Sequence, residues 1–211
     1  MTKIRVIESL TRNDFNLEDT TVYNAGTISD GYGRASGVVV EVTKGAVVDL
    51  NIDFEITMVS EAAFSAWKTS VYDYLTSEQK AYLEEHHRAS GRASWLLAAL
   101  GAVSAGGNYD HYRNKTDVFN IEGSAEKEGF LRSLYNLDLT KHKITGNIKV
   151  TGTSHIPSKV SVFIHLLNIT FSDGKNIKVI DTDKAVAADP ETKDTSKSEV
   201  AGTTLHELPT N

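Results

Sequence analysis

The sequence predicts an α+β protein: an antiparallel β-sheet or β-sandwich with an inserted helical segment and an irregular C-terminal tail. Two blocks of chain show strand-type alternation, and the block between them shows helix-type spacing. Strands and helices that are segregated along the chain are typical of the α+β class. The length of 211 residues fits one large domain. We therefore expect a single domain over residues 1–182 and a polar tail over 183–211.

The first block, residues 4–59, is expected to form strands. In residues 46–59 the even-numbered positions are apolar and the odd-numbered positions between them are mostly polar or acidic. That period of two predicts a long strand with one buried and one exposed face. The turn-forming sequence Thr43-Lys44-Gly45 precedes it, so a hairpin with the strand before it is expected.

The second block, residues 60–107, is predicted to be a helical insertion. Phe64, Trp67, Val71 and Tyr74 recur at intervals of three and four, which places them on one helix face. The sequence Thr76-Ser77-Glu78-Gln79 has the form of a capping box and predicts the start of a second helix. A third segment, residues 93–105, is apolar on all sides, which favours a buried core helix.

The third block, residues 116–182, is predicted to contain a helix over 126–135 and then a β-meander. Residues 160–171 are apolar on both faces, which indicates a central strand covered on both sides. The sequence Ser172-Asp173-Gly174-Lys175 predicts a turn, and residues 177–180 continue as the next strand.

The C-terminal tail, residues 183–211, is polar and contains three lysines against six acidic residues. Such a composition offers little apolar surface to offset the entropy lost on ordering. We therefore predict that an ordered tail docks on a second copy of the chain.

Charge and composition exclude several classes of function. The formal net charge of −6 argues against nucleic-acid binding, which depends on clustered Lys and Arg. The absence of cysteine excludes disulfides, thiolate catalysis and Cys-ligated zinc. Charged residues near the start of the sequence argue against a signal peptide, and no stretch is long and apolar enough to span a membrane. A cytoplasmic protein is the resulting expectation.

Two motifs resemble ligand-binding sequences but lack the required context. The glycine-rich stretch 30–38 would need a following helix to cradle a phosphate, whereas a strand is predicted there. Glu84 and His87 have the Glu-x-x-His spacing of di-iron helices, but that motif occurs once instead of twice. We interpret these as a flexible loop and a solvated helix end, and we assign no metal and no cofactor.

Other titratable residues also have structural interpretations. His165 lies in the most apolar strand, which favours a hydrogen-bonded core or interface histidine over a catalytic base. Asp49, Asp53 and Glu55 share the polar face of one strand, where acids ordinarily face water. No catalytic residue and no small-molecule ligand are predicted.

The function predicted from the sequence is a non-catalytic structural or interaction protein that self-assembles into a homo-oligomer. One alternative is a membrane-interacting, pore-forming-like protein that uses the apolar helix 93–105. Another is an enzyme whose site the sequence does not reveal.

Overall fold

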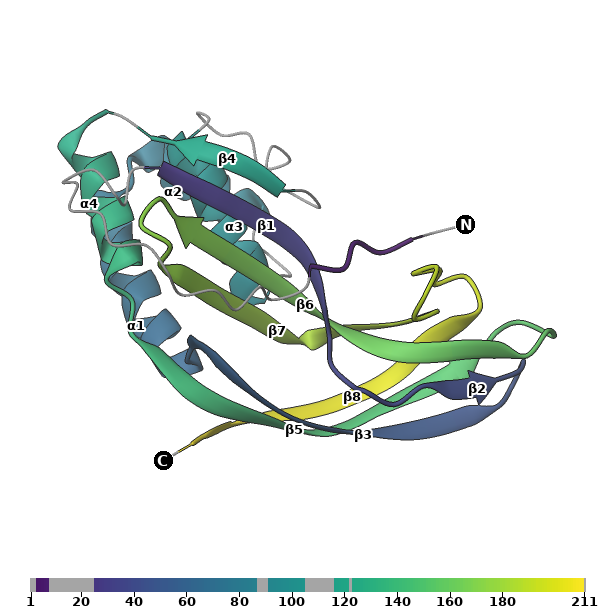
Figure 1. Ribbon diagram of the computed structural model, residues 1–211. Helices are drawn as coiled ribbons and strands as arrows, with labels where there is room; N and C mark the ends of the chain where they lie inside the picture. Colours follow the sequence, from purple (N-terminus) through teal and green to yellow (C-terminus); the bar gives the residue numbers. More distant parts are fainter. Residues whose placement is uncertain (1–2, 8–24, 87–90, 105–115, 122, 211) are drawn as a thin grey trace.

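The segments in which apolar and polar residues alternate fold into two antiparallel sheets, and the segments with helix-type spacing form a group of helices (Figure 1). The computed structural model describes residues 3–7, 25–86, 91–104, 116–121 and 123–210. The predicted α+β class with antiparallel sheets is confirmed. In chain order the elements are β1 (Ala25–Arg34), β2 (Val40–Val42), β3 (Val47–Val59), α1 (Glu61–Val71), the 3₁₀ turn η1 (Tyr72–Tyr74), α2 (Ser77–His86), α3 (Arg92–Ser104), β4 (Thr116–Asn120), α4 (Ala125–Tyr135), β5 (Leu139–Gly152), β6 (Ser158–Phe171), β7 (Asn176–Ala188) and β8 (Ser198–Pro209).

The first sheet is built around β6, which pairs with β7 on one side and with β1 and β2 on the other. The short strand β4 extends this sheet beyond β1. Alternate side chains of β6 enter two different apolar clusters. Leu167, Ile169 and Phe171 pack with the helices, whereas Ile164 and Leu166 pack with the second sheet. The predicted central strand, covered on both faces, is therefore confirmed.

The second sheet has the order β3-β5-β8 and forms the lower, curved layer in Figure 1. In β3 the even-numbered residues face the first sheet, as predicted: Leu50, Ile52 and Met58 are buried, while Phe54 and Ile56 are half-buried. Ile144 and Ile148 of β5 complete this apolar layer. The two sheets thus form a sandwich with an apolar interior.

The helices gather at one end of the molecule beside the first sheet (Figure 1). Ser60 caps α1 by accepting a hydrogen bond from the Ala63 N–H at 3.0 Å. The predicted capping box of α2 is present, because the Thr76 N–H donates to Gln79 Oε1 and the Gln79 N–H donates to Thr76 Oγ1. In α3 every residue from Ala93 to Val103 is buried, which confirms the predicted core helix.

Strand pairing and the C-terminal tail differ from expectation. The strands β5 and β6 follow each other in the chain but lie in different sheets, so among the described strands of the third block β6 and β7 form the hairpin. The strands β2 and β3 also lie in different sheets, so the hairpin expected around residues 43–45 is not formed. The segment expected to be an irregular tail instead contains the end of β7 and the twelve-residue strand β8, which pairs with β5 of the same chain. A register shift at Lys149/Val150 interrupts the alternation of β8, which hides the strand pattern in the sequence.

Candidate functional site

His165, in the central strand β6, is the predicted core histidine. Its Nδ1 lies 3.0 Å from Asp181 Oδ2 on β7, and its Nε2 lies 2.9 Å from Asp30 Oδ1 on β1. Burial lowers the pKa of His165, but hydrogen bonds and charge from Asp181 and Asp30 outweigh it and raise the pKa to about 9. His165 is therefore a cation near neutral pH, held between two carboxylates.

Asp181 links this histidine to the start of α3. Its carboxylate accepts the Ala93 N–H at 2.8 Å and the Ser94 hydroxyl at 3.3 Å, and the N-terminus of a helix favours a negative charge. Burial raises the pKa of Asp181, but His165, the Ala93 N–H and the charge of Lys184 lower it below its ordinary value. The Asp181 carboxylate is therefore stabilised as an anion.

The packing around this carboxylate requires glycine at position 91. A Cβ placed on Gly91 would lie 2.3 Å from the Asp181 carboxyl group, a distance that a real side chain does not adopt. Gly91 directly precedes α3, which begins at Arg92.

A second carboxylate, Glu207 of β8, reaches the same helix from the other sheet. It accepts a hydrogen bond from Arg92 Nη2 at 2.8 Å and another from the Glu61 N–H at 3.1 Å. Asp181 and Glu207 belong to different sheets, so the start of α3 joins both layers of the sandwich. We call these groups the joint: Asp30, Arg92, Ala93, Ser94, His165, Asp181, Lys184 and Glu207.

The chemistry of the joint is structural. A protonated His165 has no free lone pair with which to accept a proton, and both of its ring nitrogens contact carboxylates. Only about a tenth of its side chain is exposed, so a substrate has little access. These groups fix α3 against the sheets instead of forming a general-base site.

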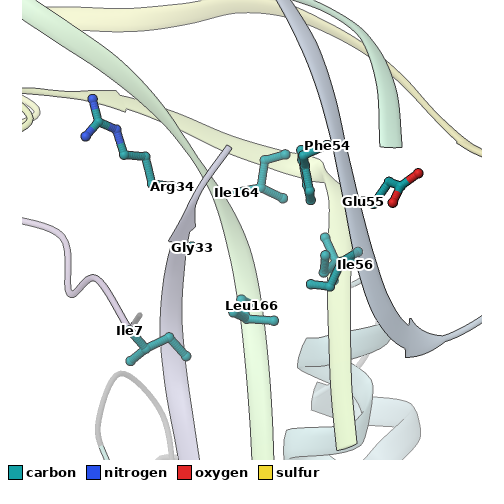
Figure 2. A pocket seen from close by; sticks show the side chains of 9 residues that line it. Ile7, Gly33, Arg34, Phe54, Glu55, Ile56, Ile164 and Leu166 are labelled. Atoms are coloured by element: carbon teal, nitrogen blue, oxygen red, sulfur yellow. The ribbon is translucent and has the colours of Figure 1, made fainter. Parts of the chain in front are cut away.

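A pocket of about 280 Å³ opens between the two sheets (Figure 2). Figure 2 shows the side chains of Arg34 and Glu55 directed away from it, although both residues border it. Gly33 of β1 lines the pocket, and a Cβ placed on it would lie 3.3 Å from Leu166 Cδ2. The glycine-rich stretch 30–38 is thus mainly strand β1 and its exit, and no helix follows it. Among its described lining residues, the wall is mainly apolar and no polar side chain points into the pocket. The remaining lining residues are Ile7, Phe54, Ile56, Ile164, Leu166 and Ile180.

The remaining candidates from the sequence do not come together. Glu84 is exposed on α2, while His87 lies outside the described residues. Within the described ranges, no group of three or more His, Asp or Glu side chains is placed to hold a metal ion. On the outer face of β3, Asp53 pairs with Lys143 at 3.0 Å and Glu55 pairs with Lys141. The row of acids is therefore matched by a row of lysines on β5.

The strand β3 is an outer strand of the second sheet, and among the described residues no strand pairs with its edge away from β5. The Gly152 N–H donates to the Ala46 carbonyl, so even-numbered residues of this strand bond to β5. The N–H and C=O groups of the odd-numbered residues consequently face away from β5. From Asp49 to Thr57 these groups make no hydrogen bond to any residue that the structure describes. This edge could pair with another strand.

A scan of family models and a search of curated proteins both found no match to this chain. Among the described helices, none has the length and apolar character needed to cross a membrane.

Proposed function

We propose that this protein is a non-catalytic interaction protein that assembles with copies of itself through the edges of its second sheet. The observation that supports the proposal is the free edge of β3. It runs for thirteen residues in continuous register with β5, without proline, glycine or lysine. An edge of this kind is a ready template for a strand from another chain.

The other edges carry features that limit pairing. The strand β4 has five residues, and the pairing of β7 with β6 shifts register at Ile164/His165. In β8 the register shift against β5 and Pro209 lie at the two ends of a segment, residues 202–208, that pairs in continuous register and has no such device inside it. Bulges, prolines and short lengths are the devices by which proteins prevent edge-to-edge pairing. The long edge of β3 lacks them, which favours a role in assembly.

The joint also supports this proposal over the membrane-interacting alternative. The apolar helix α3 is buried along its length, and Asp181 and Glu207 fasten its start to both sheets. Release of this helix would expose a large apolar surface and break these ionic contacts. The free edge of β3 needs no such rearrangement to bind a partner.

The test is the molar mass of the purified protein, measured by size-exclusion chromatography with light scattering over a range of concentrations. Asn51→Pro removes an N–H that faces the free edge and leaves the bonds to β5 in place. We expect an oligomer for the original chain and a shift to monomer for Asn51→Pro.

The matched control is Asn51→Thr, which keeps the N–H and suits a strand. It should retain the oligomer, and circular dichroism should show that both variants are folded. A monomeric original chain at every concentration would rule out the proposed function.

A further inference from the structure

The two edges of the second sheet, on β3 and β8, run in the same direction. Each strand is antiparallel to β5, so β3 and β8 are parallel to each other. Resting on the proposed self-assembly, we infer that copies join head to tail, with β8 of one copy pairing beside β3 of the next. The second sheet then continues from copy to copy through a heterologous contact.

The outer side chains of β3 disfavour the two-fold alternative. Asp49, Asp53 and Glu55 lie exposed on one face of this strand. Antiparallel pairing of β3 with its own copy would set this acidic row beside a second acidic row. Like charges on neighbouring strands destabilise a sheet. The β3 edge therefore favours a partner strand whose outer row lacks acids.

The strand β8 has such an outer row after its register shift. Gly202, Thr204, His206 and Leu208 occupy the positions that face outward beside Lys149, Asn147, Thr145 and Lys143 of β5. None of these four β8 residues is acidic, and Leu208 is 47% exposed. In β8 the carbonyl and N–H groups of Thr203, Leu205 and Glu207 face away from β5. The Thr210 N–H bonds to the Lys141 carbonyl, which shows that the even-numbered residues of this part of β8 bond to β5.

Head-to-tail pairing uses both edges, whereas a two-fold contact between two β8 strands would leave both β3 edges unpaired. Parallel pairing is slightly weaker per residue than antiparallel pairing. The absence of facing acids and the use of both edges offset that difference.

The register of the sheet supplies a direct test. Asn51 of β3, Asn147 of β5 and Thr204 of β8 lie in one row across the sheet. Within one chain Asn51 and Thr204 are separated by two strand spacings, roughly 9–10 Å. A disulfide requires Cα atoms closer than about 7 Å, so these two positions should not bridge within a chain.

The chain has no cysteine, so single thiols can be introduced without removing any. The experiment mixes two proteins, Asn51→Cys and Thr204→Cys, and treats them with oxidant or with a short bismaleimide that tolerates a shift in register. Head-to-tail pairing predicts a cross-linked dimer in the mixture and its loss when either variant is treated alone. Asn147→Cys is the matched control, because it has the same residue type, face and row on the middle strand.

Molar mass, measured on the same variants, separates the two proposals. An oligomer in which Asn51→Cys alone or Thr204→Cys alone forms the dimer would show a two-fold contact and overturn head-to-tail pairing. An oligomer with no cross-link in the mixture would exclude this pair of edges. Monomers without cross-links would instead remove the proposed self-assembly.

Discussion

The joint and the free edge of β3 lie in the same chain, yet they differ in whether their polar groups have hydrogen-bond partners within the described structure. At the joint, the Asp181 carboxylate accepts the Ala93 N–H, and Glu207 accepts the Glu61 N–H. Along β3, the backbone groups from Asp49 to Thr57 that face away from β5 bond no described residue. Buried polar groups are costly without partners, whereas water satisfies those at an exposed edge. Stability is therefore expected to depend on the joint, and association on the edge.

Removal of Asp181 should cause the largest loss in the free energy of unfolding. Asp181→Ala would leave the Ala93 N–H and one side of the His165 cation without their carboxylate partner. Removing one member of a buried ion pair typically costs about 3–5 kcal/mol. Urea denaturation of the variant should show a loss of that order in the free energy of unfolding. A loss as small as that of an exposed acid would show that the joint contributes little.

Alkaline pH should weaken the joint through His165. Its pKa is about 9 in the folded chain and about 6.5 when unfolded. A raised folded-state pKa gives stability that is fully present below pH 6.5 and lost as the pH rises through 9. The loss is on the order of 3–4 kcal/mol, because each pKa unit between about 6.5 and about 9 corresponds to about 1.4 kcal/mol.

The measurement is the free energy of unfolding across this pH range. His165→Gln, which keeps hydrogen-bonding capacity without the titration, is the control and should flatten that part of the profile. An unchanged slope in this variant would assign the pH dependence to other groups.

The smallest effect is expected on the outer face of β3. The Asp53–Lys143 ion pair is largely exposed, and exposed pairs contribute about 0.2–1 kcal/mol. Asp53→Ala should therefore change the free energy of unfolding by less than about 1 kcal/mol. Chemical denaturation measures this value directly, and high salt should reduce it further. A loss as large as that of Asp181→Ala would mean that the outer face is not solvated.

Regular local patterns explain why much of the fold could be predicted. The period of two in β3, the capping box at Thr76 and the all-apolar character of α3 depend on neighbouring residues. The strand β8 was missed because its alternation breaks at the register shift and because backbone pairing with β5 holds it. The apolar content of β8, with Val200, Leu205 and Leu208, could not reveal the contribution of Glu207. The partners of Glu207, Arg92 and Glu61, are distant in sequence.

The joint was only partly predictable for the same reason. His165 was expected to be a hydrogen-bonded core residue, but its two carboxylate partners were not identified. One signal was present in the sequence: the turn 172–175 sets the hairpin register that places His165 opposite Asp181. Asp30 carried no comparable signal, because its strand pairs with β6 across 135 residues of sequence separation.

The long separation of the Glu207 contacts bears on the order of folding. Its partners Arg92 and Glu61 lie 115 and 146 residues earlier in the chain. During vectorial synthesis on the ribosome, β3, β5 and α3 emerge before the strand that fastens them together. Contacts between distant residues slow folding, because a large loop must close before they form. We therefore expect a nascent chain that ends before β8 to hold a two-stranded second sheet, with β5 as a temporary open edge that chaperones could cover.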